Sequence, residues 1–393
     1  MIRWLGFLLV ILAILLLSRK NLGIAMFAGA IILELFFDPN NLLLRIWMNL
    51  INPSTILLAT IVGLIPIISG VLNETGQIDE LVRNMRIGRR TFLIMSPALI
   101  GLLPMPGGAL LSAPLVNKAG AKLADERKAA INIWFRHILY LVYPLSADLI
   151  VSTRSAGIGL YQPIPYLSII LFLMTLLGFF FFLPGDLGEM TYEKPFSLKG
   201  LLSPLLILLI APILDLILSE LKILPLEELA TLIAVLASLI LSIFFGKLSL
   251  MGFYRVIIKS KPWNFAFMIV GIMVFLGVFR DSGILSLLAD VPLTLDAIFG
   301  VAFLFGFITG RIVTPAGIIF PIYLVKFGTV SPLVFSLIYF GIFLGYVMTP
   351  VHPCVSLTLV SLKVDFKDYI RTIGPPIAVA ASASLLAIHF LTP

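Results

Sequence analysis

Three ionisable side chains interrupt apolar segments of this 393-residue sequence: Arg311, Asp148 and His352. An ionisable group inside a membrane-length apolar segment is costly unless it is paired or solvated, so each of the three is a functional candidate. A guanidinium such as that of Arg311 can clamp a carboxylate or phosphate through two parallel hydrogen bonds. The Asp148 carboxylate can bind sodium or carry a proton, and the His352 ring can donate to an anion or titrate near neutral pH. These residue types predict a site for a small anion and a coupled cation.

Each of these residues also has a structural interpretation, which the sequence leaves open. Asp148 could pair with Arg311 or Arg154 and only hold the segments together, and His352 could cap a helix. Arg136 and His137, which precede the first break, are both interpreted as structural.

The other candidates lie at Pro/Gly clusters that interrupt the same segments. A helix broken there frees backbone N–H and C=O groups for ligands, and nearby hydroxyls can assist or can satisfy those groups themselves. The predicted substrate-binding residues are Pro106, Gly107, Gly108, Ser112, Arg311, Thr314, Pro315, Ala316, Gly317, Thr349 and His352. The predicted ion-coupling residues are Ser146, Asp148 and His352, and the predicted helix breaks are Pro144, Pro350 and Pro353.

The composition shows that membrane helices must position these residues. Hydrophobic residues make up 60% of the chain, charged residues 12%, and the mean hydropathy is +1.12. Soluble proteins have roughly 45–50% apolar and about 25% charged residues. We therefore expect an all-α polytopic membrane protein in the lipid bilayer. The net charge of +7 is attributed to cytoplasmic loops and not to nucleic-acid binding.

Cysteine and histidine usage predicts no metal site and no catalytic residue. Cys354 is the one cysteine, and the three histidines, His137, His352 and His389, are widely spaced along the sequence. We expect no cofactor other than a bound sodium ion.

Continuous apolar runs predict about ten transmembrane helices. They cover residues 4–17, 22–37, 54–72, 130–158, 164–183, 201–219, 227–245, 263–279, 332–361 and 374–391. Two further stretches, 92–116 and 297–325, carry a Pro/Gly cluster near the middle and predict re-entrant hairpins. This assignment places most Lys and Arg residues on the cytoplasmic side when both termini lie outside the plasma membrane.

An internal repeat divides the chain. Residues 70–76 (GVLNETG) match 277–283 (GVFRDSG), and 143–146 (YPLS) match 349–352 (TPVH). The predicted organisation is a first repeat at 1–184, a cytoplasmic connector at 185–199 and a second repeat at 200–393. Five spans in each repeat give the second copy the opposite orientation. Inverted repeats with broken helices are typical of secondary transporters.

The motif LPMPGGA at 103–109, followed by SAP at 112–114 and TPVH at 349–352, carries a resemblance to a known group. The chain resembles the ion transporter superfamily, which includes gluconate permeases, citrate carriers and divalent anion/sodium symporters. Within it, the motifs are similar to those of a prokaryotic membrane family whose function was long unassigned. The resemblance implies an elevator-type carrier, often a homodimer. The Ser-Asn-Thr signature of the divalent anion symporters is absent, so dicarboxylate specificity and sodium coupling are not implied.

We therefore predict a secondary active transporter, and not an enzyme. The expected substrate is a small organic anion, with a carboxylate as first choice, coupled to H⁺ or Na⁺. The alternative is a cation/proton antiporter of the same superfamily, with Asp148 as the exchanging carboxylate. An intramembrane enzyme is a remote alternative, because Asp148 has no evident second aspartate and the sequence contains neither Gly-x-Ser-x-Gly nor His-Glu-x-x-His.

Overall fold

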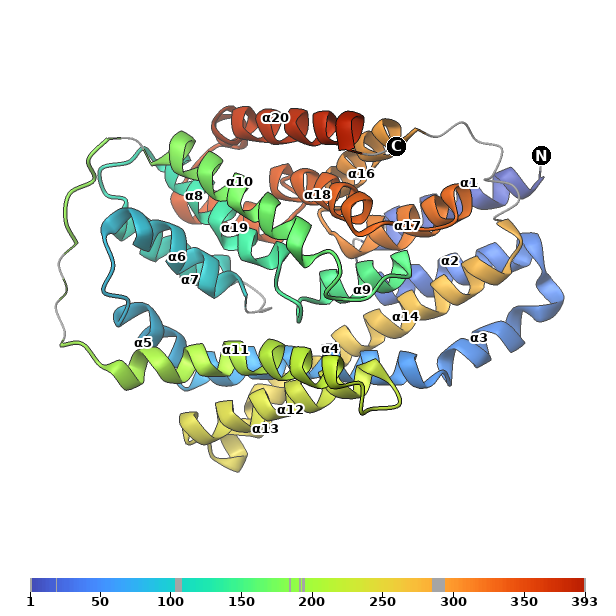
Figure 1. The fold of residues 1–393 in the computed structure, drawn as a ribbon, viewed down its shortest axis with the longest axis horizontal. Coiled ribbons are helices and arrows are strands. Elements are labelled where there is room, and N and C mark those ends of the chain that lie inside the picture. The colour runs from blue at the N-terminus through green and yellow to red at the C-terminus, as the bar shows by residue number, and fades with distance from the viewer. Residues whose placement is uncertain are drawn as a thin grey trace.

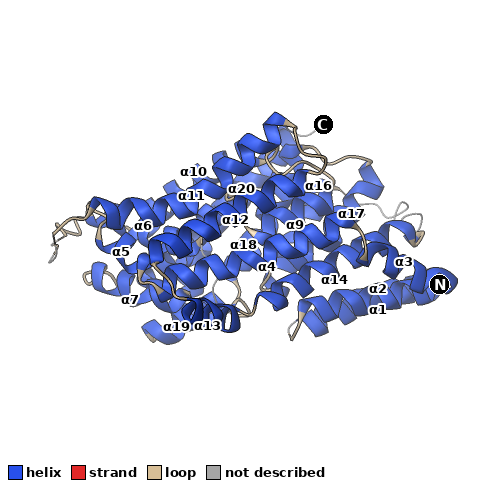
Figure 2. Cartoon of the chain, turned by 90° about the horizontal axis from the view of Figure 1, so that it is seen from below, coloured by secondary structure: helices blue, strands red, loops and turns tan. Residues whose placement is uncertain are grey.

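The computed structural model of this chain describes residues 2–18, 20–102, 108–183, 185–190, 192, 195–284 and 294–391. This described part is helical and contains no strand, as Figures 1 and 2 show. Within the described residues, six continuous helices and the broken segment Pro332–Leu362 are long and apolar enough to cross a bilayer, and four shorter helices are also apolar. The predicted all-α polytopic membrane fold is confirmed.

The helices occur in a similar order in the two halves of the chain. The first half contains α1 (Ile2–Ser18), α2 (Leu22–Phe37), η1 (Pro39–Asn41), α3 (Leu42–Leu50), α4 (Pro53–Glu74), α5 (Gln77–Arg83), α6 (Arg89–Gly101), α7 (Ala109–Ala119), α8 (Asp125–Ile138), η2 (Leu139–Leu141), α9 (Ala147–Ala156) and α10 (Ile164–Phe182). The second half contains α11 (Leu198–Leu221), α12 (Glu227–Gly246), α13 (Leu250–Ser260), α14 (Pro262–Asp281), α16 (Leu295–Thr309), α17 (Val313–Phe327), α18 (Pro332–Met348), α19 (Pro353–Leu362) and α20 (Phe366–Leu391). The division into repeats at 1–184 and 200–393 stays a prediction.

Some helix boundaries differ from those predicted. Helix α20 begins at Phe366, not at residue 374, because its polar first turns continue the helix beyond the apolar run. Helices α3 and α13 were not predicted. Both are short, with one apolar and one polar face, so neither produces a membrane-length apolar run.

Both long segments predicted to break do so. Residues 130–158 divide into α8, the short turn η2 and α9, and residues 332–361 divide into α18 and α19. Pro144 and Pro350 lie in the non-helical breaks, as predicted. Pro353 does not: it is the first residue of α19, where its missing N–H and fixed φ favour a helix start.

The turn of the second hairpin was predicted too late in the sequence. It is formed by Gly310, Arg311 and Ile312, between α16 and α17, and Gly310 adopts a φ of +59° that suits glycine. The predicted tip, residues 314–317, lies in the first turns of α17 instead. Proline is tolerated in a first helical turn because the N–H groups there have no intrahelical acceptor. In the first hairpin, α6 ends at Gly101 and α7 begins at Ala109; of the predicted tip, residues 104–108, all but Gly108 lie outside the described residues.

Helix contacts divide most of the described helices into two groups. In the α4–α14 group, α14 packs on α2, α3 and α4, α1 packs on α2, and α4 packs on α12 and α13, with α11 on α12. In the α8–α18 group, α8 contacts α6, α7, α10, α19 and α20, and α18 contacts α16 and α20. Figure 1 shows α11, α12 and α13 below and α10, α18 and α20 above. Helices α9 and α17 contact each other and α18, and α17 also contacts α16, so we place both in the α8–α18 group with the other broken helix and hairpin; α17 in addition contacts α14 of the other group.

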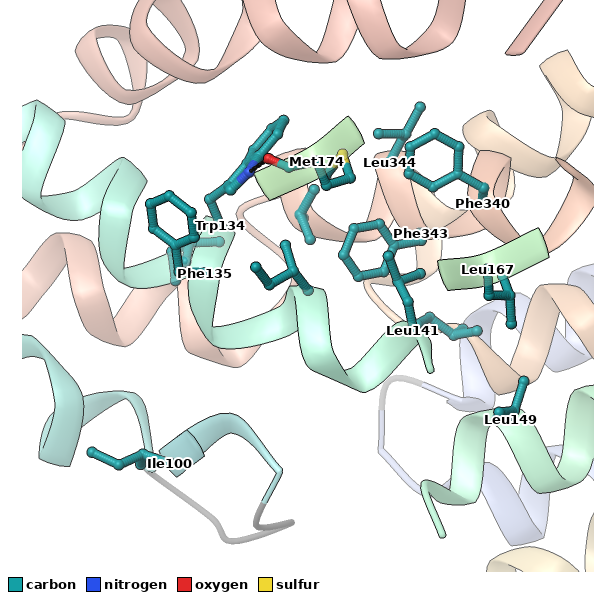
Figure 3. Close-up of a cluster of buried hydrophobic side chains, with 14 of the residues drawn as sticks. Ile100, Trp134, Phe135, Leu141, Leu149, Leu167, Met174, Phe340, Phe343 and Leu344 are labelled. Atoms are coloured by element: carbon teal, nitrogen blue, oxygen red, sulfur yellow. Dashed lines mark hydrogen bonds between the residues drawn. The ribbon is translucent and has the colours of Figure 1, made fainter. Parts of the chain in front are cut away.

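Helix α8 lies at the centre of its group. All of its residues from Lys128 to Ile138 are buried. The Trp134 indole N–H donates to the backbone carbonyl of Met174 on α10 at 2.8 Å, and Figure 3 shows both residues among the buried apolar side chains. A buried hydrogen bond of this kind fixes the position of a large ring in the core.

Helices α16 and α18 approach each other at glycines. A Cβ atom added to Gly345 would lie 2.0 Å from the carbonyl oxygen of Phe303, and one added to Gly306 would lie 2.1 Å from that of Ile342. Small residues allow membrane helices to pack backbone to backbone. This contact fixes the hairpin arm α16 against the helix that carries the second break.

Candidate functional site

Two pairs of half-helices bring the two breaks and the two hairpins together. Helix α9, which follows the first break, packs along α17 of the second hairpin, and α19, which follows the second break, packs along α7 of the first hairpin. The turn of the second hairpin meets the second break directly, since a Cβ atom on Gly310 would lie 2.8 Å from the backbone nitrogen of His352. Each hairpin therefore packs on a broken helix from the other half of the chain.

The N-termini of these half-helices carry few side-chain caps. At α9 the Ser146 hydroxyl accepts a hydrogen bond from the backbone N–H of Leu149 at 3.1 Å. The N-cap residues of α7, α17 and α19 are Gly108, Ile312 and His352, and none of these makes a side-chain cap bond within the described chain. Uncapped N-terminal N–H groups and the positive end of the helix dipole favour anions.

Arg311 and Asp148 lie on neighbouring elements of this site. Both are half-buried, they interact electrostatically, and the backbone N–H of Val313 hydrogen-bonds the Asp148 carboxylate. In the part of the chain that is described, no ion pair within 4.0 Å joins Arg311 to Asp148. Arg154, the other proposed partner of Asp148, pairs with Glu228 instead, at 2.5 Å. The guanidinium and the carboxylate are thus close without neutralising each other through direct contact.

Two buried polar atoms at the site have no hydrogen-bond partner among the described residues. One is the hydroxyl oxygen of Thr314, a fully buried residue in the first turn of α17. The other is Nδ1 of His352, a residue that is 2% exposed. Buried polar atoms are normally satisfied, so these two atoms at converging helix ends are available to bind a ligand.

Two of the other predicted ligand residues, Ser112 and Thr349, have hydroxyls that already form hydrogen bonds within the protein. Ser112 is buried on α7, where its hydroxyl donates to the Ala109 carbonyl at 3.4 Å and accepts from Arg136 at 3.3 Å. Thr349 is buried at the end of α18, and its hydroxyl accepts from the Val351 N–H at 3.2 Å. Both hydroxyls are therefore engaged by the protein itself.

The Pro/Gly clusters predicted in the two hairpins lie at or near the starts of α7 and α17. Gly108 begins α7, and Pro106 and Gly107 lie outside the described residues. Pro315, Ala316 and Gly317 are buried in α17. A Cβ atom on Gly317 would lie 3.1 Å from the terminal methyl of Met26 on α2, so this glycine faces the α4–α14 group.

Several residues at the site were not predicted from the sequence. The His137 ring lies 4.8 Å from that of His352, and Tyr346 stacks on His352 at 3.8 Å, measured between ring centroids. Tyr140 interacts electrostatically with Asp148. A signal was present: Tyr140 and Tyr346 each stand three residues before the repeated motifs YPLS and TPVH. Arg136, interpreted as structural, contacts the predicted ligand residue Ser112.

Two cavities are lined by charged residues, and none of Arg311, Asp148 and His352 lines either of them. One, of about 500 Å³, is lined by residues of both helix groups, among them Arg154, Glu228 and Arg280. The other, also about 500 Å³, is lined by residues predicted to face the cytoplasm, among them Arg89 and Lys118. In the first cavity the two arginines are accompanied by Glu227 and Glu228, whereas the described residues that line the second include basic side chains and no carboxylate, which suits an anionic solute.

Taken together, these observations define an all-helical, polytopic membrane protein in which broken helices pack on helical hairpins. The crystal structure of the Alcanivorax borkumensis YdaH transporter, described as having an unusual topology, is similar with a TM-score of 0.64 and 16% sequence identity, over 90% of this chain and 89% of that one. At this identity the likeness shows the fold alone. The chain belongs to the family described as "Protein of unknown function (DUF401)", whose model matches residues 3–391. Among curated proteins, none matches the chain.

Proposed function

We propose that the protein is a secondary active transporter of a small organic anion, with a carboxylate as first choice, coupled to H⁺ or Na⁺. The observation that carries this proposal is the meeting of the N-terminus of α19, which has no side-chain cap, with the Arg311 guanidinium and the orphaned hydroxyl of Thr314 at the start of α17. Helix N-termini and a guanidinium each bind anions, and together they match a carboxylate with its two oxygens. The chemistry of the site is that of binding, and the fold is that of a transporter.

The position of Asp148 supplies a reason for coupling. An anion bound by Arg311 and the start of α17 would be close to the Asp148 carboxylate and repelled by it. A proton or a sodium ion on Asp148 removes that repulsion, so the cation and the anion favour each other's binding. Ser146, which caps the same helix, offers a further oxygen for sodium. Symport follows from this arrangement.

The two helix groups support an elevator-type motion. All the site residues belong to the α8–α18 group, while the α4–α14 group contributes the surface against which α17 lies. We propose that the α8–α18 group carries the site past the α4–α14 group between the two cavities, in the plasma membrane, with both termini outside. We also propose a homodimer, by resemblance to the ion transporter superfamily.

A ligand screen tests the proposal. The melting temperature of the purified protein is measured against mono-, di- and tricarboxylates, sugar acids and phosphonates, each with and without sodium and at two pH values. A ligand at a hundredfold excess over its Kd stabilises the folded protein by about 2.7 kcal/mol. We expect one anion class to raise the melting temperature, with a dependence on sodium or pH.

Variants assign the shift to the site. Arg311→Ala should abolish the anion-dependent shift, whereas Arg255→Ala, at an exposed position on α13, should leave it intact. Asp148→Asn should retain anion binding and lose its dependence on sodium or pH. The proposal is overturned if no anion gives a shift, or if Arg311→Ala behaves as the wild type does.

A cation/proton antiporter remains the second candidate, because Asp148 lies at the site without a direct ion pair to Arg311 in the described structure. In that case sodium or pH alone would shift the melting temperature, no organic anion would add to it, and Asp148→Asn would abolish it. A substrate-dependent transport current would exclude this alternative.

A further inference from the structure

The second break holds a cluster of metal-ligating side chains that the anion site does not use in full. His137 of α8, His352 at the N-cap of α19 and Cys354 within α19 offer two imidazole nitrogens and one thiol sulfur, all within 4.8 Å of one another. From this cluster we infer a binding site for a soft metal cation, and from its surroundings we infer that Cu⁺ is preferred to Zn²⁺. The inference is independent of the proposed anion transport.

The hydrogen bonds of the two histidines leave one lone pair free on each ring. Nδ1 of His137 lies 2.7 Å from the backbone carbonyl of Ile133, so this nitrogen carries the proton and Nε2 presents its lone pair. An imidazole whose other nitrogen donates to a carbonyl is the usual arrangement of a metal ligand. Nδ1 of His352 is buried and has no hydrogen-bond partner among the described residues. A metal ion would satisfy this orphaned nitrogen.

The separation of the donor atoms requires only a small adjustment. Metal–nitrogen bonds of about 2.0–2.1 Å and metal–sulfur bonds of about 2.3 Å put the donors of a trigonal site roughly 3.6–3.8 Å apart. The donor atoms, which now lie within 4.8 Å of one another, would therefore have to approach by about 1 Å at most. The non-helical break before α19 can provide this movement. Pro350, Val351 and Pro353 around it are exposed, and Cys354 is half-buried, so the protein does not close the cluster off on this side.

The charges around the cluster decide between metals. Arg136 and Arg311 both interact electrostatically with His352. Zn²⁺ bound by one thiolate and two neutral imidazoles would leave a net charge of +1 facing two guanidinium groups. Cu⁺ with the same ligands leaves no net charge, and thiolate with imidazole is a soft donor set that suits Cu⁺. Neutral binding is therefore favoured in this partly buried position.

The experiment measures Cu⁺ binding by the full-length protein in detergent, under anaerobic conditions, against a competing Cu⁺ chelator. The wild type should take up one Cu⁺ per chain, with a thiolate-to-metal absorption band. Cys354 is the one cysteine, so Cys354→Ser must remove that band if the site is correct. Cys354→Ser and His137→Gln should each weaken binding by more than about 100-fold, beyond the effect of losing an outer hydrogen bond to a ligand. His389→Ala, which changes the remaining histidine, should bind as the wild type does.

Several outcomes would overturn the inference. Equal Cu⁺ binding by the wild type and Cys354→Ser would show that the cluster is not the site, as would loss of binding in His389→Ala. Tighter binding of Zn²⁺ than of Cu⁺ would refute the charge argument. The melting temperature of each variant without metal shows whether it is folded. The anion screen on Cys354→Ser separates the two proposals, because anion binding should survive where Cu⁺ binding is lost.

Discussion

The ion pair between Arg154 and Glu228 joins the two helix groups and gives the sharpest prediction of stability. Arg154 lies near the end of α9 and Glu228 at the start of α12, with 2.5 Å between guanidinium nitrogen and carboxylate oxygen. The Glu228 side chain is 3% exposed, whereas that of Arg154 is 35% exposed. Removing the arginine should therefore cost more stability than removing the glutamate.

Replacing Arg154 by glutamine leaves the buried carboxylate of Glu228 without its charged partner. Breaking a buried pair in this way costs about 3–5 kcal/mol. Glu228 is in the first turn of α12, where the helix dipole stabilises its negative charge by about 0.3–1 kcal/mol. The expected loss in Arg154→Gln is therefore about 2–4 kcal/mol. Glu228→Gln leaves only the half-exposed guanidinium, which water can solvate, so its expected loss is about 1–2 kcal/mol.

Thermal unfolding followed by tryptophan fluorescence measures these differences. At about 2 °C per kcal/mol, the melting temperature should fall by about 4–8 °C in Arg154→Gln and about 2–4 °C in Glu228→Gln. The double variant should resemble Glu228→Gln, because the stranded charge is gone. Glu227 provides the matched control: it lies 3.8 Å from the same guanidinium and is 78% exposed, so Glu227→Gln should have almost no effect.

The reasoning is refuted if Glu227→Gln destabilises as much as Glu228→Gln, or if the effects of Arg154→Gln and Glu228→Gln simply add in the double variant. Either result would mean that burial of one carboxylate does not determine the strength of this contact.

Two further predictions concern packing within the α8–α18 group. Gly345→Ala should destabilise the protein by about 1–3 kcal/mol or more, because the added methyl group would lie 2.0 Å from the Phe303 carbonyl oxygen. Gly300→Ala on α16 is the control: its added methyl group has no atom within 4 Å, so the change should be neutral or slightly stabilising. Thermal unfolding of the two variants measures the difference. Trp134→Phe should cost about 1–3 kcal/mol, because it leaves the buried carbonyl of Met174 without its donor, and unfolding followed by circular dichroism would detect the loss.

Much of the architecture could be predicted from the sequence because apolar length is a strong signal in membrane proteins. Breaks were located through Pro144 and Pro350, which interrupt segments too long for one span. The turn of the second hairpin was misplaced because proline can either end a helix or begin one. Pro315 lies in the first turns of α17, and the turn was made instead by Gly310, whose positive φ the sequence pattern did not reveal.

The candidate site could be predicted only in part. Arg311 and Asp148 were recognisable because charge is rare in apolar segments, and the fold places them close together. His137, in contrast, is 215 positions from His352 by their residue numbers, and their proximity depends on the packing of α19 against α8. Sequence spacing finds metal ligands that lie on one local element, and cannot find a cluster that tertiary packing assembles.

The two breaks use a similar backbone arrangement with different chemistry. In the repeated motif, Ser146 and Asp148 of the first half stand where His352 and Cys354 stand in the second. The first pair offers hard oxygen atoms, which suit a proton or sodium, and the second offers nitrogen and sulfur, which suit a soft metal. Arg311 interacts electrostatically with one member of each ligand set, Asp148 at the first break and His352 at the second. An anion held by that guanidinium would therefore respond to the charge state of both breaks, which is the property that a coupled carrier requires.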